Sequence, residues 1–536
     1  MKKLILLLTF LSIASIMFAQ VSKTVNLANA GTLSTSISLN ELNTITNLTL
    51  TGNIDARDFK TMREEMSFLE VLDLSEVKIA AYDGIGGSNP YGNNYLSDVI
   101  PFYAFLNPNT GQSKKSLISV ILPSSIISIG DWAFAGCTGL TNVTIPSSVT
   151  SIGDDAFWGC SGLTTVNIPS SVTSIGFGAF WKCTALTTIT IPSSVATIKY
   201  ATFSGCTGLT SVTIPSSVTI IEKNAFAGCS ALTTLTIPSS VTSIGEYAFS
   251  GCSALTNIPI PSSVTSIGFS AFSFCTKLTT IVIPSSVTSI GESAFYKCSA
   301  LTNVTIPSSV TFIRKSTFAY CSGLTTVSIP SSVTTIGENA FDRCSKLVTV
   351  SIPSSVTTIG DEAFFGCSAL TTVNIPSSVA SIRKYAFFGC SGLTSITTSR
   401  ITPVDLSGSP GVFMEINKTT CTLYVPLGSK SAYQTAPQWK DFTNIIEKDL
   451  TVTSPEINDQ TLTIYPNPTT GKIRVVFDQI PQRGTTLTVN DFTGKTILTQ
   501  FIQNKEEQID LEGNPPGVYL IRTKMKDFKV QKVILK

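Results

Sequence analysis

The spacing of the cysteines constrains this chain more than any other feature. Twelve of its 13 cysteines lie 23 residues apart, and a typical unit, Leu140–Gly162, reads LTNVTIPSSVTSIGDDAFWGCSG. Twelve units fill residues 117–392 without an insertion or deletion, and a thirteenth begins at Leu393 and decays. A fixed period of this length indicates one supersecondary unit repeated along a stack. The regularly spaced residues are Cys137, Cys160, Cys183, Cys206, Cys229, Cys252, Cys275, Cys298, Cys321, Cys344, Cys367 and Cys390.

Each unit contains one short strand followed by inward-facing apolar residues. Residues 142–145 alternate polar and apolar side chains, which predicts a half-buried strand that Pro146 ends. Gly153 is expected to permit a turn. About eight inward side chains a unit cannot form a core alone, but stacked units share one. The predicted fold is a β-rich solenoid of about twelve regular turns plus caps, followed by a small C-terminal β-sandwich.

The period and the unit pattern also indicate a family. Leucine-rich repeats have periods of 20–29 residues, which includes the observed 23. The pattern Ile-Pro-x-x-Val, Ile-Gly, Ala-Phe and Cys resembles the BspA-like class of leucine-rich repeat. One departure from the general leucine-rich pattern is that Ser-Ser-Val replaces the asparagine that follows the strand. The resemblance implies a solenoid over residues 117–398.

Irregular segments flank the regular units. Residues 20–116 contain two L-x-x-L-x-L strands and a Gly/Asn-rich loop over residues 80–98, which predicts N-terminal capping turns with an inserted loop. Residues 399–448 include LYVP and SKSAYQTAPQWKDF, and are expected to cap the last turn with a short helix or loop.

The cysteine column allows three interpretations. Neighbouring turns place cysteines within bridging distance, but their Cβ vectors point the same way, which is poor disulfide geometry. A straight column cannot converge four ligands on a metal ion. A ladder of buried free thiols is therefore favoured over disulfides and over a metal site. Cys421 lies outside the column and has no explanation from the sequence.

Composition argues against catalysis and against nucleic-acid binding. The chain has no histidine, which excludes Ser-His-Asp and Cys-His hydrolases and histidine-ligated zinc. Lys and Arg total 36 against 34 Asp and Glu, so no basic surface for nucleic acid is expected. Acid pairs such as Asp154-Asp155 and Asp361-Glu362 are interpreted as solvated edges, not as glycosidase carboxylates. We expect no enzyme activity, cofactor or metal.

Two faces of the solenoid could bind a ligand. The outward strand positions are mostly Thr, Ser or Asn, which fits a solvated ladder, or an array similar to ice-binding solenoids that Pro259 and Val282 interrupt. Aromatic and charged residues vary in the turn around Ala-Phe-x-x-Cys, and such residues often anchor interfaces and sugar sites. These turn aromatics could instead fold over the hydrophobic ridge. The candidate binding residues are Trp158, Phe177, Trp181, Lys182, Tyr200, Tyr247, Phe274, Tyr296, Tyr320 and Arg343.

Residues 1–19 have the pattern of a secretory signal peptide. Lys2 and Lys3 precede an apolar run, and Ala19 provides the small residue before a cut at Gln20. The run is short for a transmembrane anchor, and no later window has the length of a membrane span.

The tail differs from the repeats. Residues 449–460 form a polar linker, and residues 461–536 alternate as a small β-sandwich does. Several of its motifs resemble the C-terminal sorting domain of the bacterial type IX secretion system, with an ordinary adhesive sandwich module as the alternative. The motif residues are Tyr465, Pro466, Asn467, Pro468, Gly471, Gly517 and Tyr519.

Together these resemblances imply a protein secreted across the outer membrane of a Gram-negative bacterium by the type IX machinery. Its expected place is the cell surface or the extracellular medium. BspA-like proteins are associated with binding of fibronectin, fibrinogen and other host ligands, so an adhesin that recognises proteins or glycans is the leading hypothesis. A structural cell-coat or biofilm component is the alternative, and ice binding is a distant third.

Overall fold

The computed structural model describes residues 20–450 except 91 and 93. It also describes residues 462–535 except 466, 468, 478–485, 492–494, 503 and 524–530. The expected signal peptide and most of the expected linker therefore lie outside the described residues. The chain divides into two compact units, Met1–Glu447 and Lys448–Lys536.

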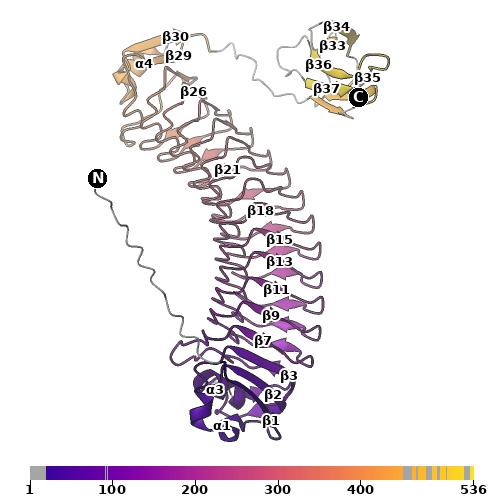
Figure 1. Ribbon diagram of the computed structural model, residues 1–536. Helices are drawn as coiled ribbons and strands as arrows, with labels where there is room; N and C mark the ends of the chain where they lie inside the picture. The colour runs from indigo at the N-terminus through magenta and orange to yellow at the C-terminus, as the bar shows by residue number, and fades with distance from the viewer. Residues whose placement is uncertain are drawn as a thin grey trace, which may run out of the picture. The chain divides into compact units, whose positions relative to one another are not determined.

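The first unit is a solenoid in which most coils contribute a short strand to a first strip of paired strands, with isolated bridges in place of strands at Thr234, Asn257 and Thr280 (Figure 1). Register is set by the repeat, since Val143 pairs with Val120 on one side and Val166 on the other. The outer strands of this strip are β1 (Ser22–Leu27), β2 (Asn47–Ile54), β3 (Val71–Ile79), β7 (Ser119–Ile121), β9 (Asn142–Thr144), β11 (Thr165–Asn167), β13 (Thr188–Thr190), β15 (Ser211–Thr213), β20 (Asn303–Thr305), β22 (Thr326–Ser328), β24 (Thr349–Ser351), β26 (Thr372–Ile375), β28 (Ser395–Thr398), β29 (Thr422–Pro426) and β30 (Asn444–Lys448).

A second strip of two-residue strands runs along another side of the coils, at a step that ends in isoleucine and is Ser-Ile or Thr-Ile in most units. Its members are β6 (Val99–Ile100), β8 (Ser128–Ile129), β10 (Ser151–Ile152), β12 (Ser174–Ile175), β14 (Thr197–Ile198), β16 (Ile220–Ile221), β17 (Ser243–Ile244), β18 (Ser266–Ile267), β19 (Ser289–Ile290), β21 (Phe312–Ile313), β23 (Thr335–Ile336), β25 (Thr358–Ile359) and β27 (Ser381–Ile382). The predicted β-rich solenoid is confirmed. The stack is longer than twelve turns, because β1–β3 precede the regular units and β29 and β30 follow them.

One hydrophobic core runs through the whole solenoid. Buried residues from Leu27 to Ile445 form a single cluster. Within it, the phenylalanine of each Ala-Phe pair, or its Thr-Phe counterpart, stacks on that of the next coil from Phe134 to Phe387, with ring centroids 5.2–5.7 Å apart. Each coil is thus buried in part by its neighbours, which is why a single unit could not fold alone.

Side chains also hydrogen-bond from coil to coil. The second serine of Ser-Ser-Val donates to the valine carbonyl of the preceding coil, as Ser171 does to Val149 at 2.6 Å. The column cysteine donates its thiol hydrogen to the preceding phenylalanine carbonyl, as Cys160 does to Phe134 at 3.1 Å. The Ser-Ser-Val departure therefore has a structural role, because it satisfies a carbonyl that the short strands leave unpaired.

Gly153 directly precedes a turn over residues 154–159, as expected, but it does not supply the left-handed residue of that turn. Its φ lies outside the left-handed region, which is adopted two residues later by Asp155 at φ 51°. A Cβ on Gly153 would instead lie 2.6 Å from the backbone nitrogen of Asp131 in the preceding coil. Glycine avoids this clash, because the neighbouring backbones approach closely here.

Substitution of this glycine coincides with breaks in the second strip. The strip is interrupted between β12 and β14 and between β19 and β21, where Lys199 and Arg314 stand in place of the glycine. Glu222 and Arg383 occupy the same position without a break.

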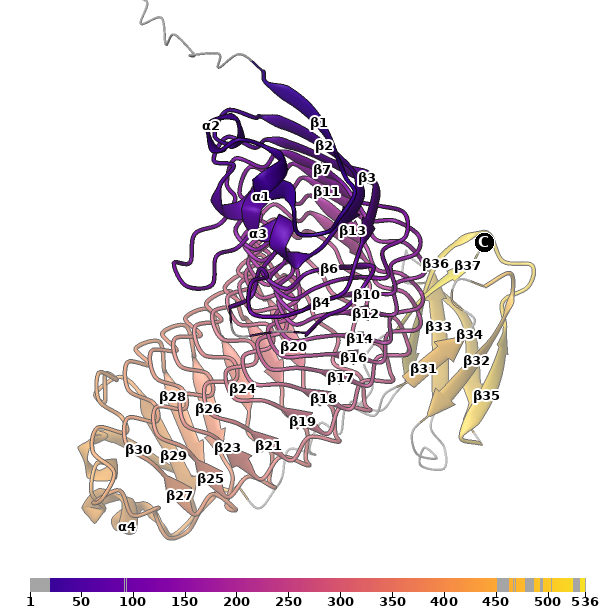
Figure 2. The ribbon, with the colours of Figure 1, turned by 90° about the horizontal axis from the view of Figure 1, so that it is seen from below.

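Both ends of the solenoid are covered. Helices α1 (Leu33–Ser36), α2 (Leu39–Leu42) and α3 (Ala56–Glu64) lie beside β1–β3, and α4 (Lys430–Thr435) lies beside β29 and β30 (Figure 2). A 3-10 helix at Trp439–Asp441 follows α4, and the buried Trp439 donates its indole hydrogen to Val404 at 2.9 Å. The loop over residues 80–98 carries a small hairpin of β4 (Tyr82–Asp83) and β5 (Asn94–Tyr95).

The second unit has its own core and two small antiparallel sheets. One sheet contains β31 (Leu462–Tyr465), β32 (Lys472–Phe477) and β35 (Glu506–Asp510). The other contains β33 (Thr486–Asp491), β34 (Thr496–Phe501), β36 (Gly517–Thr523) and β37 (Gln531–Leu535).

Candidate functional site

The residue before each column cysteine, here called the pre-cysteine position, has a left-handed backbone in all twelve regular coils. Seven coils carry glycine there, namely at Gly136, Gly159, Gly205, Gly228, Gly251, Gly366 and Gly389, with φ between 65° and 74°. The other five carry Lys182, Phe274, Lys297, Tyr320 and Arg343, with φ between 53° and 61°. An L-residue in this conformation costs about 1–2 kcal/mol that glycine avoids.

Four of these five residues lie on consecutive coils, from Phe274 to Arg343. Left-handed non-glycine residues also occur at a second turn position in eleven of the twelve regular coils, for example at Asn224 and Tyr247, so the bulk and charge of the clustered side chains, and not the backbone strain alone, distinguish them. The fold does not require these side chains, since glycine serves the same position in seven other coils. The four residues from Phe274 to Arg343 therefore form a candidate binding surface.

The clustered side chains form an alternating series of aromatic rings and cations. Lys297 Nζ lies 5.1 Å from the ring centroid of Phe274, 5.4 Å from Tyr296 and 5.5 Å from Tyr320. The guanidinium of Arg343 lies 5.6 Å from the Tyr320 ring and 5.5 Å from the ring of Phe365. These cation–π contacts hold the long cationic side chains in place along the surface.

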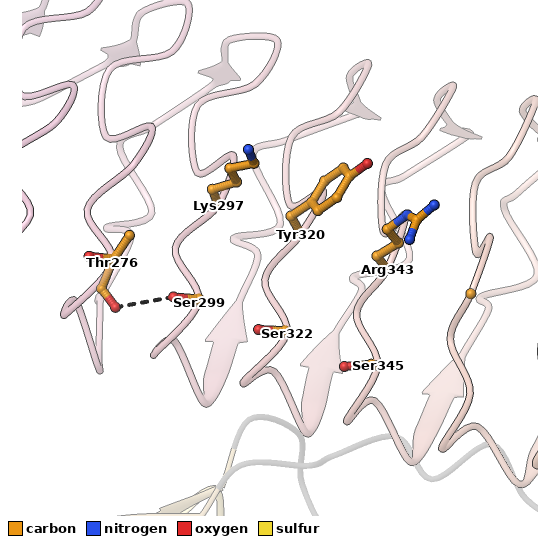
Figure 3. A pocket seen from close by; sticks show the side chains of 8 residues that line it. Thr276, Lys297, Ser299, Tyr320, Ser322, Arg343 and Ser345 are labelled. Carbon is orange, nitrogen blue, oxygen red and sulfur yellow. Dashed lines mark hydrogen bonds between the residues drawn. The ribbon is translucent and has the colours of Figure 1, made fainter.

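Three of these residues, Lys297, Tyr320 and Arg343, line an open groove of about 490 Å³. Figure 3 shows two rows across successive coils, with Lys297, Tyr320 and Arg343 in one row and hydroxyl side chains in the other. We call it the coil groove; its lining is Thr276, Lys297, Ser299, Tyr320, Ser322, Arg343, Ser345 and Gly366.

A second aromatic series lies nearer the N-terminus. Trp132 contacts Trp158 with centroids 5.9 Å apart, Trp158 contacts Trp181 at 6.4 Å, and Lys182 Nζ lies 5.4 Å from the Trp181 ring. Trp158 and Trp181 are half-buried, so their rings both cover the core and face solvent. Tyr103 continues this series, stacked on Trp132 at 6.2 Å.

Three other candidate residues lie at different turn positions. Phe177 follows the Ile-Gly step and is 46% exposed, and Tyr200 follows the equivalent Ile198-Lys199 and is 41% exposed. Tyr247 packs edge-on against Phe269. Coils with Ser-Gly or Ala-Gly before the cysteine, at residues 204–205, 227–228 and 250–251, separate the two aromatic series. Seven of the ten candidates thus fall into two groups instead of one continuous face, and Phe177, Tyr200 and Tyr247 belong to neither group. Lys297 and Phe365 were missed by the sequence reasoning.

Buried acids lie beside both series. Burial raises the pKa of Asp342 to about 6, although the Arg343 side chain 3.8 Å away opposes the shift. Burial, and then the negative charges of Asp154 and Asp131, raise the pKa of Asp155 to about 6 as well.

The column cysteines are all buried and free. Burial raises the pKa of Cys206, Cys252 and Cys321 to about 12, so these thiols are unreactive at neutral pH. Cys421, immediately before β29, is also fully buried. Among the described residues, no group of three or more Cys, Asp or Glu side chains could hold a metal ion.

The strand face presents exposed threonine and serine side chains on either side of a buried residue. Between β15 and β20 the sheet is reduced to isolated bridges at Thr234, Asn257 and Thr280, and Val282 is 77% exposed there. An extended regular hydroxyl array is therefore interrupted in the middle of the solenoid.

In the second unit, residues of the predicted sorting motif connect the loop that follows β31 to the last strand, β37. Asn467 Oδ1 accepts a hydrogen bond from the backbone of Ile534 at 3.0 Å, and Thr469 N–H donates to the Ile534 carbonyl at 2.8 Å. Tyr519 is buried and its hydroxyl donates to Pro515 at 2.7 Å. Tyr465 ends β31, Gly471 precedes β32 and Gly517 begins β36, whereas Pro466 and Pro468 lie outside the described residues.

Comparisons with protein families match both units. A model of the BspA type leucine-rich repeat region matches residues 103–233, 196–325 and 313–405. A model of the secretion system C-terminal sorting domain matches residues 463–536. None of the helices in the described part of the chain has the length and apolar character needed to cross a membrane.

Solved structures of bacterial leucine-rich repeat proteins are similar to the solenoid. A leucine-rich repeat protein from Bacteroides ovatus is 32% identical, with a TM-score of 0.52, over 62% of this chain and 89% of that one. A leucine rich cell surface protein from Faecalibacterium prausnitzii is 36% identical over 53% and 79% of the two chains, with a TM-score of 0.38. No curated protein matches.

The sorting domain places the protein across the outer membrane, at the cell surface or in the extracellular space. The repeat model covers more than half of the chain, and its matches span the regular coils from residue 103 to residue 405, whereas β1–β3 and β29–β30 lie outside them. The chain belongs to the BspA-type leucine-rich repeat family and carries a type IX secretion sorting domain.

Proposed function

We propose that this exported surface protein is an adhesin: a non-catalytic scaffold that binds proteins or glycans through the turn side of its solenoid. The observation that supports this most directly is the set of bulky residues at the pre-cysteine position, where glycine would serve the fold better. Aromatic and arginine side chains are the usual anchors of binding interfaces. Host fibronectin and fibrinogen are candidate partners because BspA-like proteins are associated with them.

The test is binding of the chain from Gln20 onward to immobilised fibronectin, fibrinogen and a glycan panel, measured by surface plasmon resonance. The combined variant Trp158→Ala, Trp181→Ala and Lys182→Ala removes exposed parts of the N-terminal aromatic series. A matched control, Thr188→Ala with Thr190→Ala, alters the strand face of the same region. We expect saturable binding that the first variant weakens and the control does not.

Unchanged affinity in the triple variant would remove the N-terminal series from the binding surface. Loss of affinity in the threonine control alone would move the site to the strand face. A second function, that of a structural cell-coat component, predicts self-association of the purified chain with no response to any ligand in the panel. The continuous open stack of coils, which can contact other copies along its length, is the feature that favours this alternative.

A further inference from the structure

We propose that the coil groove binds a linear acidic polysaccharide, a chain of sugars that carry carboxylate or sulfate groups. This inference rests on the proposed binding function and adds the ligand class and the place of binding. It follows from the charge of the groove, its aromatic centre, its row of hydroxyl groups and the direction in which these repeat.

The charge of the groove is positive. Lys297 and Arg343 line it, and Lys277 and Lys346 are exposed two residues beyond the cysteines of the flanking coils. No ion pair in the described part of the chain involves Lys277, Lys297 or Lys346. Arg343 has Asp342 as a neighbour at 3.8 Å, but that carboxylate is only 6% exposed. The cations are therefore available to an anionic ligand.

Tyr320 gives the groove an apolar surface between the two cations. Its ring lies within 5.6 Å of both Lys297 Nζ and the Arg343 guanidinium. An aromatic ring with a polar rim suits the mixed apolar and hydroxyl surface of a sugar. A small inorganic anion would not use this ring, so the ligand must present both an apolar face and negative charge.

Hydroxyl groups form the other side of the groove, one from each coil. Ser299 donates to the carbonyl of Thr276 at 3.4 Å, while the hydroxyls of Ser322 and Ser345 donate to no group in the described part of the chain. A hydroxyl can both donate and accept, as sugar hydroxyls also do. The row therefore offers repeated hydrogen bonds that a saccharide can satisfy.

The direction of the groove favours a polymer. Lys297 and Arg343 lie two coils apart, which is roughly 10 Å at the usual spacing of neighbouring strands. Cation, ring, cation and hydroxyls all advance along the solenoid axis (Figure 3). A chain with acidic groups at regular intervals can engage both cations while one sugar lies on Tyr320.

Substitution with glycine tests the proposal without disturbing the coils, because glycine is the residue of seven other coils at this position. The variant combines Lys297→Gly, Tyr320→Gly and Arg343→Gly. The matched control is Asn224→Gly, which relieves a left-handed residue at φ 58° outside the groove. Retained melting temperature in both variants shows that the solenoid persists.

Titration calorimetry would use the chain from Gln20 onward with four probes: an oligogalacturonate, a sulfated dextran, a neutral dextran and an oligoglutamate. We expect at least one acidic sugar to bind, the triple variant to weaken that binding at least tenfold, and Asn224→Gly to leave it unchanged. Binding should also weaken as salt is raised. Equal affinity for oligoglutamate would overturn the saccharide assignment, and equal affinity for neutral dextran would overturn the acidic one.

The proposal is also overturned if neither acidic sugar binds, or if the triple variant binds as tightly as the natural chain. Neither result would overturn the broader adhesin proposal, because binding to fibronectin, fibrinogen and the glycan panel tests that proposal independently. A protein that binds fibronectin but no acidic sugar would retain the adhesin function and lose this site.

Discussion

The glycine of the Ile-Gly step gives the sharpest test of how the coils stack. Gly268 lies in the middle of the second strip, directly after β18, and donates its N–H to Ile244 at 2.9 Å. Its φ is compatible with any residue, so backbone preference alone predicts that Gly268→Ala stabilises the protein by about 0.4–1 kcal/mol. The structure predicts the opposite.

A Cβ at Gly268 would lie 2.6 Å from the backbone nitrogen of Glu246, whereas ordinary van der Waals contacts begin at 3.4 Å. The neighbouring coils must therefore separate by about 0.8 Å, the difference between these two distances. Overpacking of this kind costs about 1–3 kcal/mol. Weakening of the Gly268–Ile244 hydrogen bond adds about 1 kcal/mol, so we expect a total loss of about 2–4 kcal/mol.

Gly251→Ala is the informative comparison, because its strain has a different origin. Gly251 has φ 74°, but a Cβ there would meet only Gly228 at an ordinary 3.5 Å. The cost is the left-handed conformation alone, about 1–2 kcal/mol. Urea unfolding followed by circular dichroism measures both variants, and hydrogen exchange locates the loosened coils. A Gly268→Ala protein as stable as the natural one would refute the close-approach argument.

Three further predictions concern stability and reactivity. Asp155→Asn should raise the urea midpoint at pH 7.5 but not at pH 4. The carboxyl of Asp155 has a pKa of about 6 in the folded protein and of about 4 in the unfolded chain. The stability that its protonation contributes is therefore present below pH 4 and is lost as pH rises through 6. An equal effect of the substitution at both pH values would contradict this assignment. Ser263→Ala removes the donor that Val241 uses at 2.6 Å and should cost about 1 kcal/mol in urea unfolding; no change would mean that water replaces the hydroxyl. All 13 cysteines should resist alkylation in the folded protein and react after denaturation without a reductant, because they are buried and free; mass spectrometry that finds native disulfides would contradict the structure.

Much of the fold follows from the repeat itself. A 23-residue period with Val143, Phe157 and Cys160 at fixed places requires stacking, since these side chains have no other way to leave water. The sequence does not show that the two recurring glycines of the unit have different roles. Gly153, in the Ile-Gly step, allows close approach of the neighbouring backbone, whereas Gly159, before the cysteine, adopts a left-handed φ of 68°.

The binding site was predicted only in part. Tyr320 and Arg343 were identified because aromatic and charged residues vary in the turn, whereas Lys297 was missed beside Tyr296. The available signal was positional: Lys297 occupies a place where most units have glycine. Composition cannot show that three side chains on successive coils share one groove, because that depends on which turn positions face the same way.

The central claim is that bulky left-handed residues on the turn side serve binding, not folding. Hydroxyl-radical footprinting of the chain from Gln20 onward, with and without whichever ligand it binds, measures this directly through the oxidation of aromatic side chains. We predict protection of Phe274, Tyr296 and Tyr320 on ligand addition, with strand-face residues such as Tyr424 unchanged. Protection confined to the strand face, with the coil groove oxidised equally in both states, would contradict the account.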